Sequence, residues 1–114
     1  MVSTYMPGYG DIVWLVLDPR TGHEQSGRRP AIVISDKLFK ELTSMAIVCP
    51  ITSRIKGLPF EVMLKGTKTE GAVLPIHVKS IDWVARKMKY IEKASNELTG
   101  IVAQSVGVII GLDL

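Results

Sequence analysis

The chain has 114 residues, of which 46% are apolar and 22% charged, and its formal net charge is +3 at pH 7. This length and balance fit one globular domain over residues 1–114 and exclude a disordered or collagen-like chain. The longest apolar runs, residues 12–17 and 106–112, are too short to cross a bilayer, and the start of the chain lacks a secretory signal pattern. We therefore expect a cytoplasmic protein without a membrane span, whose mild positive charge favours an anionic partner.

Short strands dominate the predicted elements. Residues 11–17 form a nearly continuous β-branched and aromatic run, which is typical of a strand buried on both faces. Polar stretches rich in Gly and Pro separate the later strands, which we expect at residues 31–35, 45–51, 60–64, 72–74, 77–82 and 87–92. Residues 18–29 and 52–59 are expected to be loops, and residues 36–43 a short polar excursion with room for one helical turn.

The end of the chain changes to a helical period. From Ser95 onward, apolar side chains recur on one face. Ser95 is a suitable N-cap, Glu97 lies in the first turn, where the helix dipole favours negative charge, and Gly111 is a plausible stop. The connections between strands are too short for crossover helices, so we predict a mainly β fold. Its form is a small antiparallel barrel or half-open sheet with a C-terminal helix packed on it.

Cysteine and histidine give no sign of a metal or redox centre. Cys49 is the single cysteine and lies in an apolar run, so we expect a buried small hydrophobe more than a reactive thiolate. The two histidines, His23 and His77, show no spacing that argues for a metal site. We expect neither a metal ion nor a cofactor.

The stretch EQSGRRP, residues 24–30, carries the first candidate chemistry. A plain turn needs no two adjacent guanidiniums before a buried strand. Because Pro30 restricts the backbone of Arg29, that guanidinium is suited to bidentate contact with phosphate. The alternative for Arg28 and Arg29 is a solvated pair. Glu24 on the same loop either neutralises one arginine or accepts a proton.

A second stretch, ITSRIKG, offers two hydroxyls and two positive charges from Thr52, Ser53, Arg54 and Lys56. If the strands at residues 31–35 and 45–51 are antiparallel neighbours, the loop before the first and the loop after the second share one end of the sheet. This geometry predicts a meeting point around one phosphate for Glu24, Arg29, Thr52 and Ser53.

These stretches resemble the MazF/PemK family of toxins, the ribosome-independent mRNA interferases of toxin–antitoxin pairs. The likeness runs in order through MVSTYMPGYGDIVWLVLDP, GHEQSGRRPAIVIS, CPITSRIKGLPFEV and VKSIDWVAR. It implies one toxin endoribonuclease domain with an SH3-like, CcdB–PemK barrel, a homodimer and an acidic MazE-like antitoxin. It also implies metal-independent, sequence-specific cleavage of single-stranded mRNA to 2′,3′-cyclic phosphate and 5′-hydroxyl ends, which stops translation and growth.

The resemblance also implies roles for three residues. Its functional arginine and threonine match Arg29 and Thr52, and its loop glutamate matches Glu24. We expect Arg29 to stabilise charge on the phosphoryl oxygens, Thr52 to donate to one of them and Glu24 to accept the 2′-proton. His77 stands near a position where many relatives carry a glutamine that helps to read bases. It is either a substitute base or, more in keeping with its position, a neutral side chain at the groove wall.

A wider set is predicted to bind RNA: Gln25, Arg28, Ser53, Arg54, Lys56, His77, Lys79, Trp83 and Arg86. Its basic members would neutralise backbone phosphates, whereas Lys87 and Lys89 belong either to this groove or to a solvated face. Trp83 is expected to stack on a base or to join a dimer interface, and Trp14 to belong to the core.

Two other functions stay open at this point. A toxin of the same fold can poison DNA gyrase without catalysis, and a barrel that has lost activity can bind nucleic acid without cutting it. Neither alternative needs the set of Glu24, Arg29 and Thr52, so the sequence favours the nuclease.

Overall fold

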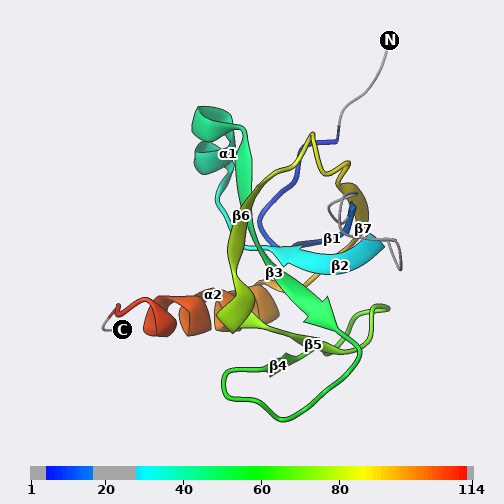
Figure 1. Ribbon diagram of the computed structural model, residues 1–114, viewed down its shortest axis with the longest axis vertical. Coiled ribbons are helices and arrows are strands. Elements are labelled where there is room, and N and C mark those ends of the chain that lie inside the picture. Colours follow the sequence, from blue (N-terminus) through cyan, green and yellow to red (C-terminus); the bar gives the residue numbers. More distant parts are fainter. Residues whose placement is uncertain (1–4, 17–27, 113–114) are drawn as a thin grey trace.

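The computed structural model describes residues 5–16 and 28–112, so the predicted site residues Glu24 and Gln25 lie outside the described part (Figure 1). In chain order its elements are β1 (Asp11–Val16), β2 (Arg28–Val33), α1 (Lys37–Thr43), β3 (Met45–Thr52), β4 (Val62–Met63), β5 (Ala72–Val73), the 3₁₀ helix η1 (Pro75–His77), β6 (Lys79–Asp82), β7 (Lys89–Lys93) and α2 (Asn96–Ile109). None of the helices in this part of the chain has the length and apolar character needed to cross a membrane.

The strands form one curled antiparallel sheet in the order β4-β5-β3-β2-β1-β7, and β6 pairs separately with β3. Strand β3 is the spine of this sheet. It pairs with β2 along its middle, with β6 near its start and with β5 at its end. In Figure 1, α1 lies at one end of β3 and the β4–β5 hairpin at the other. The predicted mainly β fold with a C-terminal helix is confirmed.

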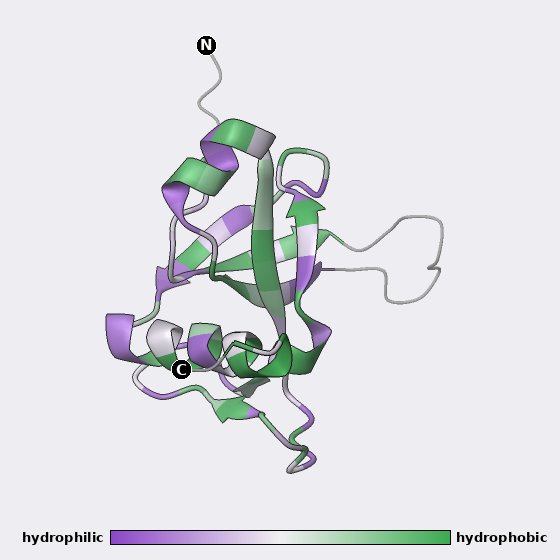
Figure 2. Ribbon diagram, turned by 90° about the vertical axis from the view of Figure 1, so that its left-hand side faces the viewer, coloured by the Kyte–Doolittle hydropathy of each residue, from purple (hydrophilic) through white to green (hydrophobic). Residues whose placement is uncertain are grey.

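The core consists of two clusters on opposite faces of the sheet. Ile12 and Ile32 pack with Leu98 and Val102 of α2, whereas Val13 and other alternating residues form the second cluster inside the curl. The split follows from the strand period, because successive side chains point to opposite faces. Figure 2 shows green, apolar residues dominating the strands, while green and purple alternate along the helices. Each fully buried side chain of this size stabilises the fold by about 1.5–3 kcal/mol.

Helix α2 begins and ends as its sequence predicts. The Ser95 side chain accepts a hydrogen bond of 3.0 Å from Leu98 N, which satisfies one of the free backbone donors of the first turn. At the other end Gly111 adopts a φ of 94°, and Leu112 N donates to Gly107 O at 2.8 Å. A left-handed glycine that lets the chain fold back in this way is a common helix stop.

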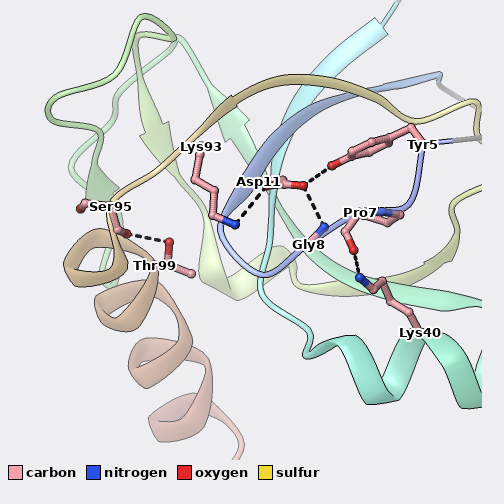
Figure 3. A network of polar contacts seen from close by, with 8 residues as sticks. All are labelled: Tyr5, Pro7, Gly8, Asp11, Lys40, Lys93, Ser95 and Thr99. Carbon is pink, nitrogen blue, oxygen red and sulfur yellow. Dashed lines mark hydrogen bonds and ion pairs between the residues drawn. The ribbon is translucent and has the colours of Figure 1, made fainter.

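A polar network fixes residues 5–8 to the sheet and to α1 (Figure 3). The buried carboxylate of Asp11 accepts hydrogen bonds from Tyr5 Oη and from Gly8 N, and it forms an ion pair of 3.4 Å with Lys93 Nζ. The buried Lys40 of α1 donates from Nζ to Pro7 O. Burial, together with the adjacent Asp11 carboxylate, raises the pKa of Tyr5 far above its ordinary value.

The structure corrects several predicted boundaries. Arg28 and Arg29 belong to β2 and not to a loop, because they pair with Val16 and Leu15 of β1. The strand expected at residues 77–82 begins only at Lys79, after the 3₁₀ turn that starts at Pro75.

Two further corrections concern β4 and β1. The strand expected at residues 60–64 shrinks to Val62–Met63, because Phe60 has a left-handed φ of 70°. In β1 only the first half is buried on both faces. Trp14, predicted to be core, is half-buried, as are Leu15 and Val16 after it, although all three stay paired with β2.

Candidate active site

Antiparallel pairing brings Arg29 and Thr52 to one end of the sheet. Ala31 of β2 pairs with Pro50 of β3, so the residues before the first and after the second lie side by side. Both side chains line the same pocket. Of the four residues expected at this point, Arg29 and Thr52 meet in the pocket, Ser53 does not line it, and Glu24 is not among the described residues.

The first pocket has a volume of about 310 Å³ and combines an apolar floor with a polar rim. Leu15, Pro50 and Leu74 contribute to the floor, and Arg29, Thr52 and Lys79 supply the polar groups. Arg29 and Lys79 are exposed, whereas Thr52 is half-buried. Two positive charges beside low-dielectric walls favour an anionic ligand more strongly than the same charges on an open surface.

A second pocket of about 160 Å³ adjoins the first, because Thr52 and Leu74 line both. Its remaining lining residues are Arg54, Lys56, Leu58, Glu61 and His77. We call the two pockets together the basic groove. The groove thus runs from Arg29 and Lys79 past Thr52 to the side chains of the β3–β4 loop.

Thr52 occupies the centre of the basic groove and is held there by two contacts. Its Oγ1 accepts a hydrogen bond of 3.0 Å from Arg54 N, which leaves the hydroxyl proton free to donate to a ligand. Gly71, next to β5, packs directly on the backbone of Thr52. With a φ of 128° and no room for a Cβ beside the Thr52 carbonyl, this position requires glycine.

The two adjacent arginines have different surroundings. Arg29 lines the first pocket, whereas the guanidinium of Arg28 lies 4.9 Å from the ring centroid of Trp14, in a cation–π contact. Alternation along β2 explains the divergence, because neighbouring side chains of a strand point to opposite faces. Arg28 was predicted to bind RNA, but the structure does not bring it into the basic groove.

The other predicted RNA contacts divide in the same way. Arg54, Lys56, His77 and Lys79 line the groove, but Ser53, Trp83 and Arg86 do not. Trp83 is half-buried against the second core cluster, and its Nε1 is buried with no hydrogen-bond partner among the described residues. Arg86 ties the β6–β7 turn to β1, because Val16 N donates to its carbonyl at 3.1 Å.

Sequence reasoning missed Glu61 and Gly71. Glu61 lines the second pocket, and its carboxylate accepts hydrogen bonds from Lys56 N and Gly57 N. The sequence offered one sign of this role, because Glu61 is an acidic residue directly after a loop that carries Arg54 and Lys56. Gly71 carried no signal beyond that of a turn, because its role depends on contact with a residue far away in sequence.

Cys49 lies in the core, as expected. Its side chain is fully buried, and burial raises the pKa of the thiol to about 12. The thiol is therefore protonated at neutral pH and unreactive. Among residues 5–16 and 28–112, no group of three His, Cys, Asp or Glu side chains is arranged to hold a metal ion.

In sequence, the chain is similar to known toxins. A family model described as PemK-like, MazF-like toxin of type II toxin-antitoxin system matches residues 9–110. The endoribonuclease toxin MazF of Escherichia coli K12 is 40% identical over 111 residues, which cover 97% of this chain and 100% of the relative. The endoribonuclease PemK of Escherichia coli is 35% identical over 98 residues, which cover 77% of this chain and 74% of the relative.

The structure is also similar to crystal structures from Deinococcus radiodurans. MazF in crystal form I superposes with a TM-score of 0.83 at 39% identity, covering 96% of this chain and 100% of the other. A chain of the MazE–MazF structure in form III gives a TM-score of 0.86 at 36% identity with the same coverage. These matches confirm the prediction of a MazF-like endoribonuclease toxin. The chain belongs to the PemK-like, MazF-like family of type II toxin–antitoxin toxins.

Proposed function

We propose that this chain is a sequence-specific, ribosome-independent endoribonuclease that cuts single-stranded mRNA without a metal ion and thereby stops translation and growth. The observation that carries the proposal is the shared pocket of Arg29, Thr52 and Lys79 on a chain of this toxin family. The products would carry 2′,3′-cyclic phosphate and 5′-hydroxyl ends. RNA cleavage of this kind needs no group beyond the RNA and the side chains of the protein.

The reaction makes three demands on the site. The 2′-hydroxyl must lose a proton as it attacks the adjacent phosphorus, the phosphoryl oxygens must be stabilised as charge grows, and the leaving 5′-oxygen must be protonated. Arg29 suits the second demand, because a guanidinium keeps its charge and matches two phosphoryl oxygens. Thr52 adds a neutral donor, since its Oγ1 already accepts from Arg54 N and its proton points elsewhere.

Glu24 is the proposed proton acceptor, and His77 is the less favoured substitute. His77 lines the second pocket beside Arg54 and Glu61, away from Arg29 and Lys79. This position supports a role in contacting the RNA beside the cleaved bond more than a role in removing the 2′-proton. An imidazole at that wall can donate to or accept from a base edge.

RNA would lie along the basic groove, with Arg54, Lys56 and Lys79 near its phosphates. Neutralising phosphates releases counterions, so affinity would fall steeply with salt. An acidic MazE-like antitoxin is the proposed protein partner, supported by the MazE–MazF structure from Deinococcus radiodurans, and the positive charge of the groove makes it the proposed binding surface. We propose further that residues 1–114 act as one domain in the cytoplasm and form a homodimer. The exposed apolar residues Val108, Ile110 and Leu112 in and after α2 support a surface for a second copy.

The test is cleavage of a long single-stranded RNA of mixed sequence in excess EDTA, followed by mapping of the cut sites and their ends. Discrete cuts with cyclic phosphate ends are expected. Arg29→Ala should lower the rate by about a hundred- to a thousand-fold, the usual loss for one donor that stabilises developing charge. Arg28→Ala is the matched control, because it removes the same charge outside the groove. Intact RNA across several sequences would refute the nuclease, and a gyrase supercoiling assay would follow.

A further inference from the structure

The loop between β3 and β4, residues 53–61, brings two positive side chains to the basic groove without regular secondary structure to hold them. Arg54, Lys56 and their neighbours are exposed, and one acidic side chain turns inward among them. The half-buried Glu61 accepts hydrogen bonds at both carboxylate oxygens, with Gly57 N at 3.1 Å and Lys56 N at 3.4 Å. Two successive backbone donors thus converge on one carboxylate.

The backbone of this loop explains why the two hydrogen bonds to the Glu61 carboxylate, here called the Glu61 clamp, are needed. Gly57 and Phe60 both have left-handed φ angles, of 69° and 70°, and the remaining backbone bond is 3.2 Å from Glu61 N to Leu58 O. A loop without a helix or strand ladder is fixed by whichever side chains satisfy its backbone groups. A carboxylate is suited to this task, because it accepts at two oxygens and binds N–H groups more strongly than a neutral oxygen does.

The negative charge of Glu61 also supports a role in holding the loop. It is the only carboxylate among the described residues that line the basic groove, whose other charged members are Arg29, Arg54, Lys56 and Lys79. A negative charge in this place repels the phosphates that the groove attracts. Its presence is therefore explained by what it holds in the protein and not by direct attraction of RNA.

We propose that Glu61 is a positioning residue that fixes residues 54–57 so that Arg54 and Lys56 present their charges to RNA beside Thr52. The opposite end of this segment is tied to Thr52 itself, through the hydrogen bond from Arg54 N to Oγ1. Glu61 thus sets how tightly RNA is held next to the cleaved bond, and it takes no part in proton transfer. This inference rests on the proposed function.

The experiment measures kcat and KM for a short RNA that contains one mapped cut site. Glu61→Ala removes both acceptors and Glu61→Gln leaves one, while Glu70→Ala removes the same charge from an exposed turn. We expect KM to rise about tenfold in Glu61→Ala, which loses both hydrogen bonds, and about threefold in Glu61→Gln, which keeps one of them to a neutral acceptor. We expect kcat to change less than KM, and Glu70→Ala to leave both nearly unchanged.

A second readout follows the loop without any RNA. Amide hydrogen exchange at Lys56 and Gly57, measured by NMR, should become faster in Glu61→Ala, with the amides of β2 and β3 unchanged. If Glu61→Ala does not fold, the same two amides in Glu61→Gln decide the question. Their exchange should rise, because the Gln amide offers a single acceptor.

Three outcomes would overturn the inference. Unchanged KM and unchanged exchange in Glu61→Ala would show that the clamp positions nothing. A fall in KM in Glu61→Ala and Glu61→Gln would show that Glu61 acts only by repelling RNA. A wild-type protein that cuts no RNA would overturn the proposed function, and the role of Glu61 with it. This failure can be told apart from the first two outcomes, because both of those require a wild-type protein that is active.

Discussion

Replacing Gly71 with alanine tests whether the position of Thr52 depends on the bare backbone beside it. An added Cβ would overlap the carbonyl oxygen of Thr52 and lie 3.0 Å from its carbonyl carbon. The φ of 128° adds strain for any L-residue. Together these effects should lower the free energy of unfolding by about 3 kcal/mol, of which roughly 1–2 kcal/mol is backbone strain.

The overlap also predicts a loss of activity, because β5 or Thr52 must move to relieve it. A displacement of about 1 Å in a catalytic group typically lowers the rate about a hundredfold. Gly66→Ala is the matched control, since Gly66 has a φ of 73° but nothing within 4 Å of an added Cβ. It should show the strain alone, with cleavage near the wild-type rate.

Urea unfolding and initial rates on one RNA substrate measure both effects. Equal stability and equal kcat in Gly71→Ala and Gly66→Ala would show that the contact between Gly71 and Thr52 positions nothing. A variant that lost stability but kept kcat would show that the strand moves without carrying Thr52 along. In that case the packing of Gly71 against Thr52 would matter for folding only.

Three more predictions follow from single side chains. Thr52→Val keeps the shape but loses both the hydroxyl donor and the acceptor of Arg54 N, so in steady-state cleavage assays kcat should fall about a hundredfold and KM should rise as well. Lys79→Ala should reduce the slope of log affinity against log salt by about one, if Lys79 contacts one phosphate, as measured by fluorescence anisotropy with a non-cleavable RNA analogue. Although its burial alone would raise the pKa of Glu92, hydrogen bonds from Lys68 N and from Thr69 lower it. The stabilisation from ionised Glu92 is therefore fully present above its pKa in the unfolded chain and is lost as the pH falls through its lower pKa in the folded protein. The difference in free energy of unfolding between wild type and Glu92→Gln, measured in urea, should therefore close in acid. A gap that widened in acid would contradict this assignment.

The sequence was most informative where a local rule decides the structure. The cap at Ser95 and the stop at Gly111 depend on neighbouring backbone groups, and both were predicted. The meeting of Arg29 and Thr52 was also predicted, because it needs only the assumption that two consecutive strands pair in antiparallel fashion. These are the cases in which short-range chemistry and strand geometry leave few alternatives.

The rest depends on contacts between distant parts of the chain. Nothing near Gly71 reveals that Thr52 lies against it, and nothing near Arg28 reveals the ring of Trp14. The role of Glu61 was missed because an alternating strand pattern already accounted for it. Boundaries failed where a backbone feature interrupts the pattern, as at Phe60 with its left-handed φ.

Strand β3 and the loop after it differ in how far they tolerate substitution. Strand β3 contributes Val48, Cys49 and Ile51 to the two core clusters and ends at Thr52, so changes there alter folding and the centre of the groove together. The side chains of residues 53–60 are all exposed and contribute none of the buried core residues. Substitutions of the exposed side chains in this loop therefore cost the core little, except at Gly57, where the left-handed φ favours glycine. Under the proposed function, substitutions of these exposed side chains would change the contacts with RNA while the core residues of β3 stay in place.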